Sequence, residues 1–352
     1  MALQLVATGA AIGAASGDTA IASPAAAWRA LPDMAIGRSG FGFVHLPKLR
    51  TLLAVSGGGA AGVVLNSTSY LDMSASPLAW SDGPPLAGAR DMACALLGAT
   101  SVVCAGGSVG VDGKDTELAT ITVLDASSGL HGAAWVVSAV ALPSARSGVA
   151  AAPTLDAKGV LFVGGFCCYG TFLSETLLYD GHSIKTLAPL PFKRASLALV
   201  ALPLHGVHLA FGGGALAPAY NESATYDARA DRWSVGPSLV DGSGRNRMGS
   251  AVLTRRGGGA AAAVDAREPS ADEWVIAIGG FSFQPFFEPM ASTECYSANA
   301  HAWIQRASAA TPCVTTPLPA ARGSPAAAAI NDTCVVVAGG LPDSTSTLML
   351  CV

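Results

Sequence analysis

Residues 161–170 read LFVGGFCCYG, an apolar run with a glycine doublet, two adjacent cysteines and an aromatic residue. Alone, this stretch fits a phosphate-binding loop, a redox or metal site, or a strand with its turn. An apolar strand and doublet recur, however, along the whole chain: LLAVSGG ending at Gly58, VVCAGG at Gly107, LFVGG at Gly165, HLAFGG at Gly213, VIAIGG at Gly280 and VVVAGG at Gly340. A module of about 50 residues indicates a propeller or a solenoid, so we interpret the doublet as a turn.

Three other marks keep their order within each period. After the doublet comes a strand that usually ends in Asp: SYLD (69–72), TVLD (122–125), LLYD (177–180), ATYD (224–227) and the weaker ECYS (294–297). A tryptophan follows, at Trp80, Trp135, Trp233 and Trp303, while SIKTL (183–187) takes its place in the third repeat. An arginine then opens the next apolar strand: Arg38, Arg90, Arg146, Arg194, Arg247 and Arg322.

These marks predict four-stranded antiparallel units, because β-branched and aromatic residues favour strands and the dense Gly and Pro punctuation leaves no room for helices. Doublet, Tyr/Leu-Asp, Trp and Pro-x-x-Arg in this order resemble the kelch repeat of the kelch and galactose-oxidase-like propellers, over nearly the whole chain. The resemblance implies an all-β, six-bladed propeller. Repeat three departs from it by lacking Trp, and repeat five by having Ser297 in place of Asp.

The two chain ends predict how the ring closes. STSTLMLCV (344–352) forms the third strand of the last blade, and AAAWRALPDMAIGR (25–38) supplies its fourth strand. The rival is a seventh, incomplete blade built from residues 3–23. We therefore expect a single propeller over 23–352, with a signal peptide or an N-terminal strand or tail over 1–22. RRGGGAAAAVDAREPSAD (255–272) is expected to be an insert between the first two strands of blade five.

Composition and motifs exclude several classes of function. A net charge of −4 gives no basic field for nucleic acid. The uncharged stretch 197–220 contains two histidines, two prolines and Gly-Gly-Gly, so we interpret it as two strands and not as a membrane span. GGGAAG (57–62) matches a dinucleotide fingerprint but precedes a strand, so no cofactor is expected. The scattered histidines and the adjacent Cys167 and Cys168 predict no metal site and no catalytic residues.

The compartment stays open, with the balance on the cytoplasmic side. Cys94 and Cys104 fall opposite each other if the turn of CALLGATSVVC centres on Ala99, and they could form a disulfide in an oxidising compartment. Buried thiols are the favoured state at this stage. Three sequons, at Asn66, Asn221 and Asn331, would be glycosylated only in a secreted protein.

The arginines and aromatics are the candidate ligand-binding residues. Symmetry would place Arg38, Arg90, Arg146, Arg194, Arg247 and Arg322 around one mouth of the central channel. In kelch adaptors similar to this chain, arginines at this position help to bind acidic peptides, which suits a guanidinium. The alternative is that each arginine hydrogen-bonds carbonyls of the adjacent blade and serves closure. The loops FCCYGTF and FSFQPFFEP would add Phe166, Tyr169, Phe172, Phe281, Phe283, Phe286 and Phe287, or these rings pack on the blade below.

The sequence thus predicts a monomeric, non-catalytic binding module that holds a protein or acidic peptide on one propeller face. The alternative is a small-molecule enzyme or lectin-like binder of sugar type at the same channel mouth. An apolar channel floor with a perturbed acid or histidine would favour the enzyme, and a broad open rim would favour peptide binding.

Overall fold

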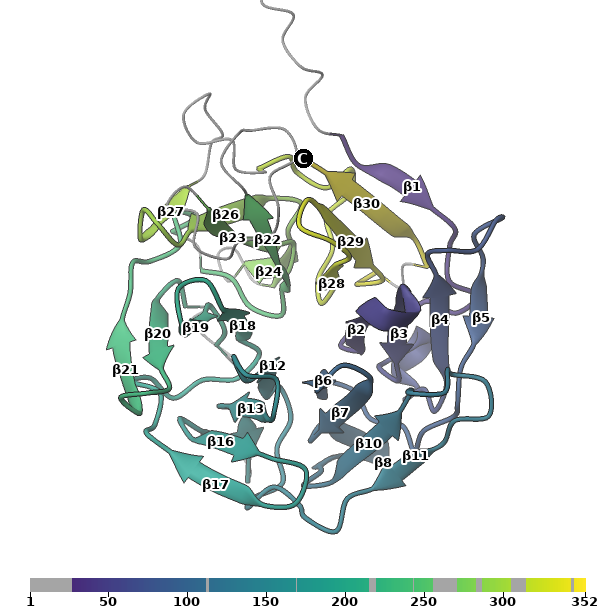
Figure 1. Ribbon diagram of the computed structural model, residues 1–352, viewed down its shortest axis with the longest axis horizontal. Helices are drawn as coiled ribbons and strands as arrows, with labels where there is room; N and C mark the ends of the chain where they lie inside the picture. The colour runs from purple at the N-terminus through teal and green to yellow at the C-terminus, as the bar shows by residue number, and fades with distance from the viewer. Residues whose placement is uncertain are drawn as a thin grey trace, which may run out of the picture.

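The computed structural model is a ring of antiparallel sheets around a common axis (Figure 1). It describes residues 27–111, 114–168, 170–214, 220–242, 244–255, 271–282, 287–304, 315–342 and 345–352. Within these ranges six sheets have four strands each, and we number the blades 1 to 6 in chain order. The predicted six-bladed all-β fold is therefore confirmed.

Each blade has an inner strand beside the axis, two middle strands and an outer strand. Blades 1 and 2 consist of β2 (Gly42–Leu46), β3 (Thr51–Val55), β4 (Thr68–Asp72) and β5 (Trp80–Asp82), then β6 (Ala93–Leu97), β7 (Ser101–Ala105), β10 (Ile121–Asp125) and β11 (Trp135–Val137). Blades 3 and 4 consist of β12 (Ala150–Pro153), β13 (Val160–Val163), β16 (Thr176–Tyr179) and β17 (Ile184–Leu187), then β18 (Ala198–Leu202), β19 (Val207–Phe211), β20 (Ser223–Asp227) and β21 (Arg232–Val235). Blades 5 and 6 consist of β22 (Gly249–Arg255), β23 (Asp272–Ile278), β26 (Thr293–Ser297) and β27 (Ala302–Ile304), then β28 (Ala326–Ala329), β29 (Cys334–Ala338), β30 (Thr347–Cys351) and β1 (Arg29–Leu31).

The ring closes by strand exchange between the two ends of the described chain, as predicted. β1 pairs antiparallel with β30, and Arg29 lies opposite Met349 and Leu31 opposite Thr347. The N-terminal strand therefore completes blade 6, and no edge of that blade's third strand is left open. Residues 1–26 and most of the expected insert, 256–270, lie outside the described ranges.

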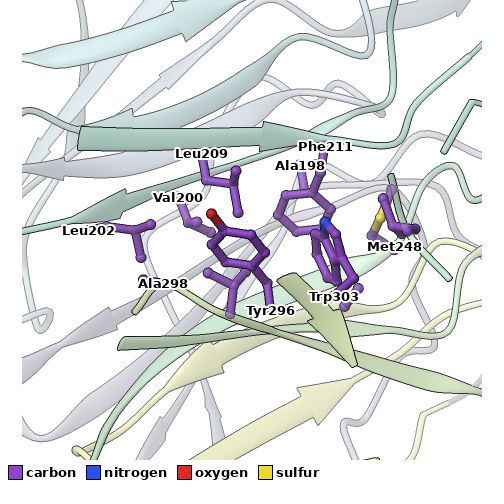
Figure 2. Close-up of a cluster of buried hydrophobic side chains, with 12 residues drawn as sticks. Ala198, Val200, Leu202, Leu209, Phe211, Met248, Tyr296, Ala298 and Trp303 are labelled. Carbon is purple, nitrogen blue, oxygen red and sulfur yellow. The ribbon is translucent and has the colours of Figure 1, made fainter. Parts of the chain in front are cut away.

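The hydrophobic core lies between neighbouring blades. Figure 2 shows the cluster between blades 4 and 5, where the ring of Trp303 lies 4.9 Å from that of Phe211 and 5.4 Å from that of Tyr296 (centroid distances). Alternate residues of a strand face the two sides of its sheet, so each blade presents apolar side chains to both of its neighbours. The outer-strand tryptophans also tie blades together: the indole N–H of Trp80 donates to Pro32 O at 2.9 Å, and that of Trp135 to Pro84 O at 3.1 Å.

The doublet is a turn whose two residues both have left-handed backbone. In blade 3, φ is +67° at Gly164 and +111° at Gly165, and a Cβ on Gly164 would lie 2.5 Å from the carbonyl oxygen of Arg194. The N–H of Gly165 donates to that same carbonyl in the next blade at 2.9 Å. Glycine is therefore required by conformation and by the close approach of the next blade.

One face of the ring carries the segments that lead into the inner strands and the connections between second and third strands. These two segments pair by a backbone bridge in every blade, as Ser147 does with Phe166. Three of the connections form hairpins: β8 (Ser108–Val111) with β9 (Lys114–Glu117), β14 (Phe166–Cys167) with β15 (Thr171–Phe172), and β24 (Phe281–Ser282) with β25 (Glu288–Pro289). The remaining elements within the described ranges are two 3-10 turns, η1 (Pro47–Leu49) and η2 (Ala60–Gly62). We call the face that carries these entry segments and hairpins the mouth face.

The cysteines differ from the sequence-based expectation. Cys94 and Cys104 are directly opposite in β6 and β7 and form a disulfide, and Cys334 and Cys351 do the same in β29 and β30. Cys295 is disulfide-bonded as well. The favoured interpretation of Cys94 and Cys104 as buried thiols is therefore wrong, because cross-strand neighbours bring the two Cα atoms to 4.1 Å.

The apolar stretch 197–220 contains the β18 and β19 hairpin, in agreement with the prediction of two strands. Within the ranges that the structure describes, no helix has the length and apolar character needed to cross a membrane.

Candidate functional site

Six residues, one from each blade, form a ring on the mouth face: Gly40, Asp91, Gly148, Ser196, Arg247 and Ser324. Each has a left-handed φ, between +49° and +60°. The backbone N–H of a member donates to the carbonyl of the member before it, at 2.7 to 2.9 Å from Gly40 through to Arg247 and at 3.4 Å from Gly40 to Ser324. All six members of this mouth ring line one small space on the axis.

Five arginines stand two positions before a ring member and are buried: Arg38, Arg146, Arg194, Arg245 and Arg322. Nη1 of each donates to the carbonyl of the first doublet residue in its own blade, at 2.7 to 3.2 Å. The backbone carbonyl of each accepts from the doublet of the preceding blade. Each of these arginines therefore holds the doublet turn of its own blade and connects that blade to the preceding one. This arrangement is close to the alternative considered above, in which the arginines serve closure of the ring.

Two positions of the expected arginine ring need correction. In blade 5 the buried position belongs to Arg245 and not to Arg247, which belongs to the mouth ring. In blade 2 the buried position belongs to Ala89, and Arg90 follows it. The doublet of blade 1 is likewise Ser56 and Gly57, one residue earlier than the sequence pattern suggested.

Acidic neighbours neutralise most of these arginines. Arg146 pairs with Glu175, Arg194 with Glu222 at 3.4 Å, and Arg245 with the buried Glu294 at 3.0 Å. Burial also lowers the pKa of Arg38 to about 10, and it lowers the pKa values of Arg194 and Arg322. A symmetric ring of six free guanidiniums is therefore not what surrounds the mouth.

Arg90 lies on the mouth face but away from the axis. Its guanidinium pairs with Asp115 of the β8–β9 hairpin and donates to Gly62 O at 3.3 Å. It lines neither of the cavities described next.

Among the described residues, Arg247 is the arginine that reaches the axis. A cavity of about 120 Å³ opens at the mouth ring, with a floor of apolar residues: Phe41, Met92, Val149, Leu197, Met248 and Pro325. Arg247 Nη1 donates to Asp91 Oδ1 at 2.8 Å across this space, and the two side chains are 38% and 15% exposed. We call this space the axial cavity.

A second cavity, of about 140 Å³, adjoins the first between blades 3 and 4. Its walls include Phe166 and Phe172, which pair across the β14–β15 hairpin with their rings 5.3 Å apart. Gly148, Ser196 and Arg247 line both cavities, so Arg247 stands between them. We call this second space the aromatic cavity.

The other predicted aromatics lie elsewhere. Phe281 is buried, and its ring covers Gly323 of blade 6, where a Cβ would lie only 1.9 Å from the ring. Phe287 is 37% exposed and its ring lies 5.5 Å from that of Phe281. Tyr169, Phe283 and Phe286 lie outside the described residues. The structure therefore brings together Phe166, Phe172 and Arg247 from the predicted set.

Asp91, Ser196 and Ser324 were missed from the sequence. A signal for them exists: each stands two residues after the position that is Arg in five blades, as in ARD (89–91), RAS (194–196) and RGS (322–324). Ser324 is of particular interest, because it lines the axial cavity and its buried hydroxyl has no hydrogen-bond partner among the described residues.

A cluster of titratable groups lies apart from the mouth. His205, in the turn between β18 and β19, contacts Glu273 of blade 5 through Nδ1 at 2.8 Å and Asn299 through Nε2 at 2.9 Å. Burial lowers the pKa of His205, but the hydrogen bonds and the charges of Glu273 and Asp272 outweigh burial and raise it overall. Among the described residues no group of three or more His, Cys, Asp or Glu is arranged to hold a metal ion.

No protein-family model and no curated protein matches this sequence. Among solved structures, the chain is similar to YjhT, with a TM-score of 0.67, 11% sequence identity, and coverage of 92% of this chain and 95% of that chain. At this identity the likeness shows the propeller fold alone.

Proposed function

We propose that this propeller is a kelch-type binding module, acting as a monomer, which holds a peptide or protein partner on its mouth face. A carboxylate of the partner pairs with Arg247, and an apolar side chain beside it enters the aromatic cavity. The proposal narrows the sequence-based site to one arginine and two phenylalanines.

The observation that supports it is the position of Arg247 between two cavities of different character. On one side lie Asp91 and the axial cavity, and on the other lie the rings of Phe166 and Phe172. A guanidinium has five donors in a planar fork, and within the described residues that of Arg247 makes one hydrogen bond. Its remaining donors suit a carboxylate, which binds such a fork in a bidentate manner.

The volumes of the two cavities match those of single inserted side chains. A cavity of roughly 150 Å³ accommodates a benzene-sized molecule, so the aromatic cavity of about 140 Å³ takes one side chain. The backbone hydrogen bonds between the members of the mouth ring narrow the central channel beside these cavities. A partner would therefore insert single side chains while the rest of it lies on the hairpins of the mouth face. Aromatic and arginine residues at such points are typical binding hot spots.

A second candidate is a small-molecule binder or enzyme of sugar type at the same mouth. The apolar floor of the axial cavity favours it. Against it, no histidine lines either cavity within the described residues, and the one acid there, Asp91, is paired with Arg247. These features favour binding over acid–base chemistry.

Ligand-observed NMR with N-acetyl-phenylalanine tests the proposal, because this probe carries one carboxylate and one apolar ring. We expect binding by the natural protein and at least a fivefold loss in Arg247→Gln. Arg90→Gln is the matched control, since it removes an arginine from the same face outside both cavities, and it should bind like the natural protein. Equal binding by all three proteins, or none by the natural protein, would reject the site.

A further inference from the structure

The polar groups of the axial cavity are under-satisfied in the free protein. Asp91 and Arg247 share a single hydrogen bond, and the described residues give neither side chain another. A carboxylate can accept about four hydrogen bonds and a guanidinium can donate five. Ser324 adds a buried hydroxyl without a partner among those residues. Such a set in the lining of a cavity points to a polar ligand that brings both donors and acceptors.

A ligand with a carboxylate alone would bind here at a cost. If it displaced Asp91 from Arg247, it would leave a carboxylate that is only 15% exposed without its partner. If it bound Arg247 beside Asp91, two carboxylates would share one guanidinium, and like charges at close range repel. Arg247 is the one basic side chain that lines either cavity in the described part of the chain, so no second cation would relieve the excess.

A ligand that also carries a cation avoids both costs. Its carboxylate takes Arg247, its ammonium group takes Asp91, and one ion pair is exchanged for two. Because Arg247 and Asp91 are themselves in contact, the two charges of the ligand must lie within a few ångströms of each other. The aromatic cavity on the other side of Arg247 then receives an apolar group.

We infer that the mouth selects a zwitterionic ligand, with a carboxylate and an ammonium group close together and an apolar side chain beside them. This inference rests on the proposed function and names the chemistry of its ligand. The same chemistry occurs in a single amino acid and in a peptide with neighbouring acidic and basic side chains.

The test is a cycle of four probes that share one ring: phenylalanine, N-acetyl-phenylalanine, phenylalanine amide and N-acetyl-phenylalanine amide, titrated by ligand-observed NMR. We expect phenylalanine to bind the natural protein at least about fivefold more tightly than N-acetyl-phenylalanine. In Asp91→Asn this advantage of the ammonium group should disappear while the preference for a carboxylate remains. Asn is a suitable replacement because it tolerates the left-handed φ of +55° at this position.

A second arm uses the tripeptide N-acetyl-Lys-Phe-Glu-amide and its Lys-to-Gln counterpart. If the tripeptide binds more tightly than phenylalanine, the ligand is a peptide whose two charges are on neighbouring side chains. If phenylalanine binds more tightly, the ligand is a single amino acid. The inference is overturned if neither ammonium group improves binding to the natural protein. If N-acetyl-phenylalanine still binds in a manner that depends on Arg247, the proposed function survives that result, whereas loss of the carboxylate preference would remove both.

Discussion

Arg247 and Asp91 form an ion pair across the axis of the propeller, with 2.8 Å between Nη1 and Oδ1. They are 156 residues apart and belong to blades 5 and 2, which face each other in a ring of six (Figure 1). The pair therefore connects opposite halves of the ring, and it also occupies the guanidinium that, among the described residues, lines the axial cavity. The occupation of the Arg247 guanidinium by Asp91 can be tested directly by measuring ligand binding.

Asp91 competes with any anionic ligand for Arg247. Replacing Asp91 by Asn should raise the affinity for N-acetyl-phenylalanine about threefold, since it removes a negative charge and frees one donor. The free energy of unfolding should change by no more than about 1 kcal/mol, because Arg247 is 38% exposed. Titration by NMR and urea unfolding measure the two effects. Unchanged or weaker binding of the anion would show that the pair does not control the site.

The buried arginines should respond to mutation quite differently from Arg247. Arg245→Met removes the bonds to Gly279 O and Ser292 O and leaves the buried carboxylate of Glu294 without its cation. We expect a loss of about 3 to 5 kcal/mol in the free energy of unfolding. Arg247→Met, two residues away, should cost less, about 1 to 2 kcal/mol, because it leaves only the partly exposed Asp91 without its cation. Similar losses in urea unfolding for both variants would contradict the assignment of Arg245 to the fold.

The blades could be predicted from the sequence because each mark reports a local backbone requirement. A doublet with two left-handed residues and no room for a Cβ leaves little choice but glycine, as at Gly164 and Gly165. Blade 1 shows the limit of this signal. SGGG (56–59) allows two registers, and Ser56 takes the first doublet position because its hydroxyl bonds the backbone of Ala89 at 2.7 Å.

The site could be predicted only in part, because its contacts join segments that are far apart in the chain. GRNR (244–247) contains two arginines, and only burial separates the structural Arg245 from Arg247 at the mouth. In blade 2 the structural arginine is replaced by Ala89, so the pattern assigned Arg90 to its place. Asp91 had no partner in its own repeat, since its partner lies in the opposite blade.

The state of the cysteines gives a chemical prediction. Cys168 is exposed, whereas burial, together with a hydrogen bond to Cys168, raises the pKa of Cys167 to about 11. At pH 7.5 a maleimide should therefore label Cys168 rapidly and Cys167 slowly, since the thiolate is the nucleophile. Cys94, Cys104, Cys334 and Cys351 should react only after reduction and unfolding, as mapped by peptide mass spectrometry.

The same experiment on protein from its native source addresses the compartment. Disulfides persist in oxidising compartments, so protection of these four cysteines after unfolding without a reductant would favour a secreted protein over a cytoplasmic one. Labelling of Cys94 or Cys104 in the unfolded protein without a reductant would instead restore the buried-thiol interpretation.

The contact between His205 and Glu273 predicts a pH dependence of stability. The pKa of His205 is raised above its ordinary value of 6.5 in the folded protein, so protonated His205 stabilises the junction of blades 4 and 5. This contribution is complete below pH 6.5 and is lost as the pH rises through the folded pKa. The difference in unfolding free energy between the natural protein and His205→Gln should therefore shrink from pH 5.5 to pH 8.5.

His208 provides a control of opposite sign three residues away. Burial lowers its pKa in the folded protein, where Nε2 lies 2.9 Å from Pro153 O. Its contribution is therefore present above pH 6.5 and is lost as the pH falls through the folded pKa. Relative to His208→Gln, the natural protein should lose stability on acidification. If both differences moved in the same direction with pH, neither assignment would stand.

The closure of the ring predicts a large effect of a short deletion. Removing residues 1–34 takes away β1, the buried Leu31 and Met34, and the bond from the Trp28 indole to Thr316 O at 3.0 Å. It also exposes the edge of β30, which is a template for aggregation. We expect a thermal midpoint lower by at least about 10 °C and self-association in size-exclusion chromatography, since loss of one buried leucine alone costs about 2 to 5 kcal/mol.

Removing only residues 1–22 is the matched control, because it keeps Trp28, β1 and Met34. This variant should melt with the natural protein if 1–22 is a signal peptide or a tail, as the sequence suggests. Leu31→Ala in the full chain separates the effect of packing from that of strand pairing: it keeps the ladder of β1 with β30 and should lie between the two deletions in stability. A 1–34 deletion that melts like the natural protein would mean that β1 does not hold blades 6 and 1 together.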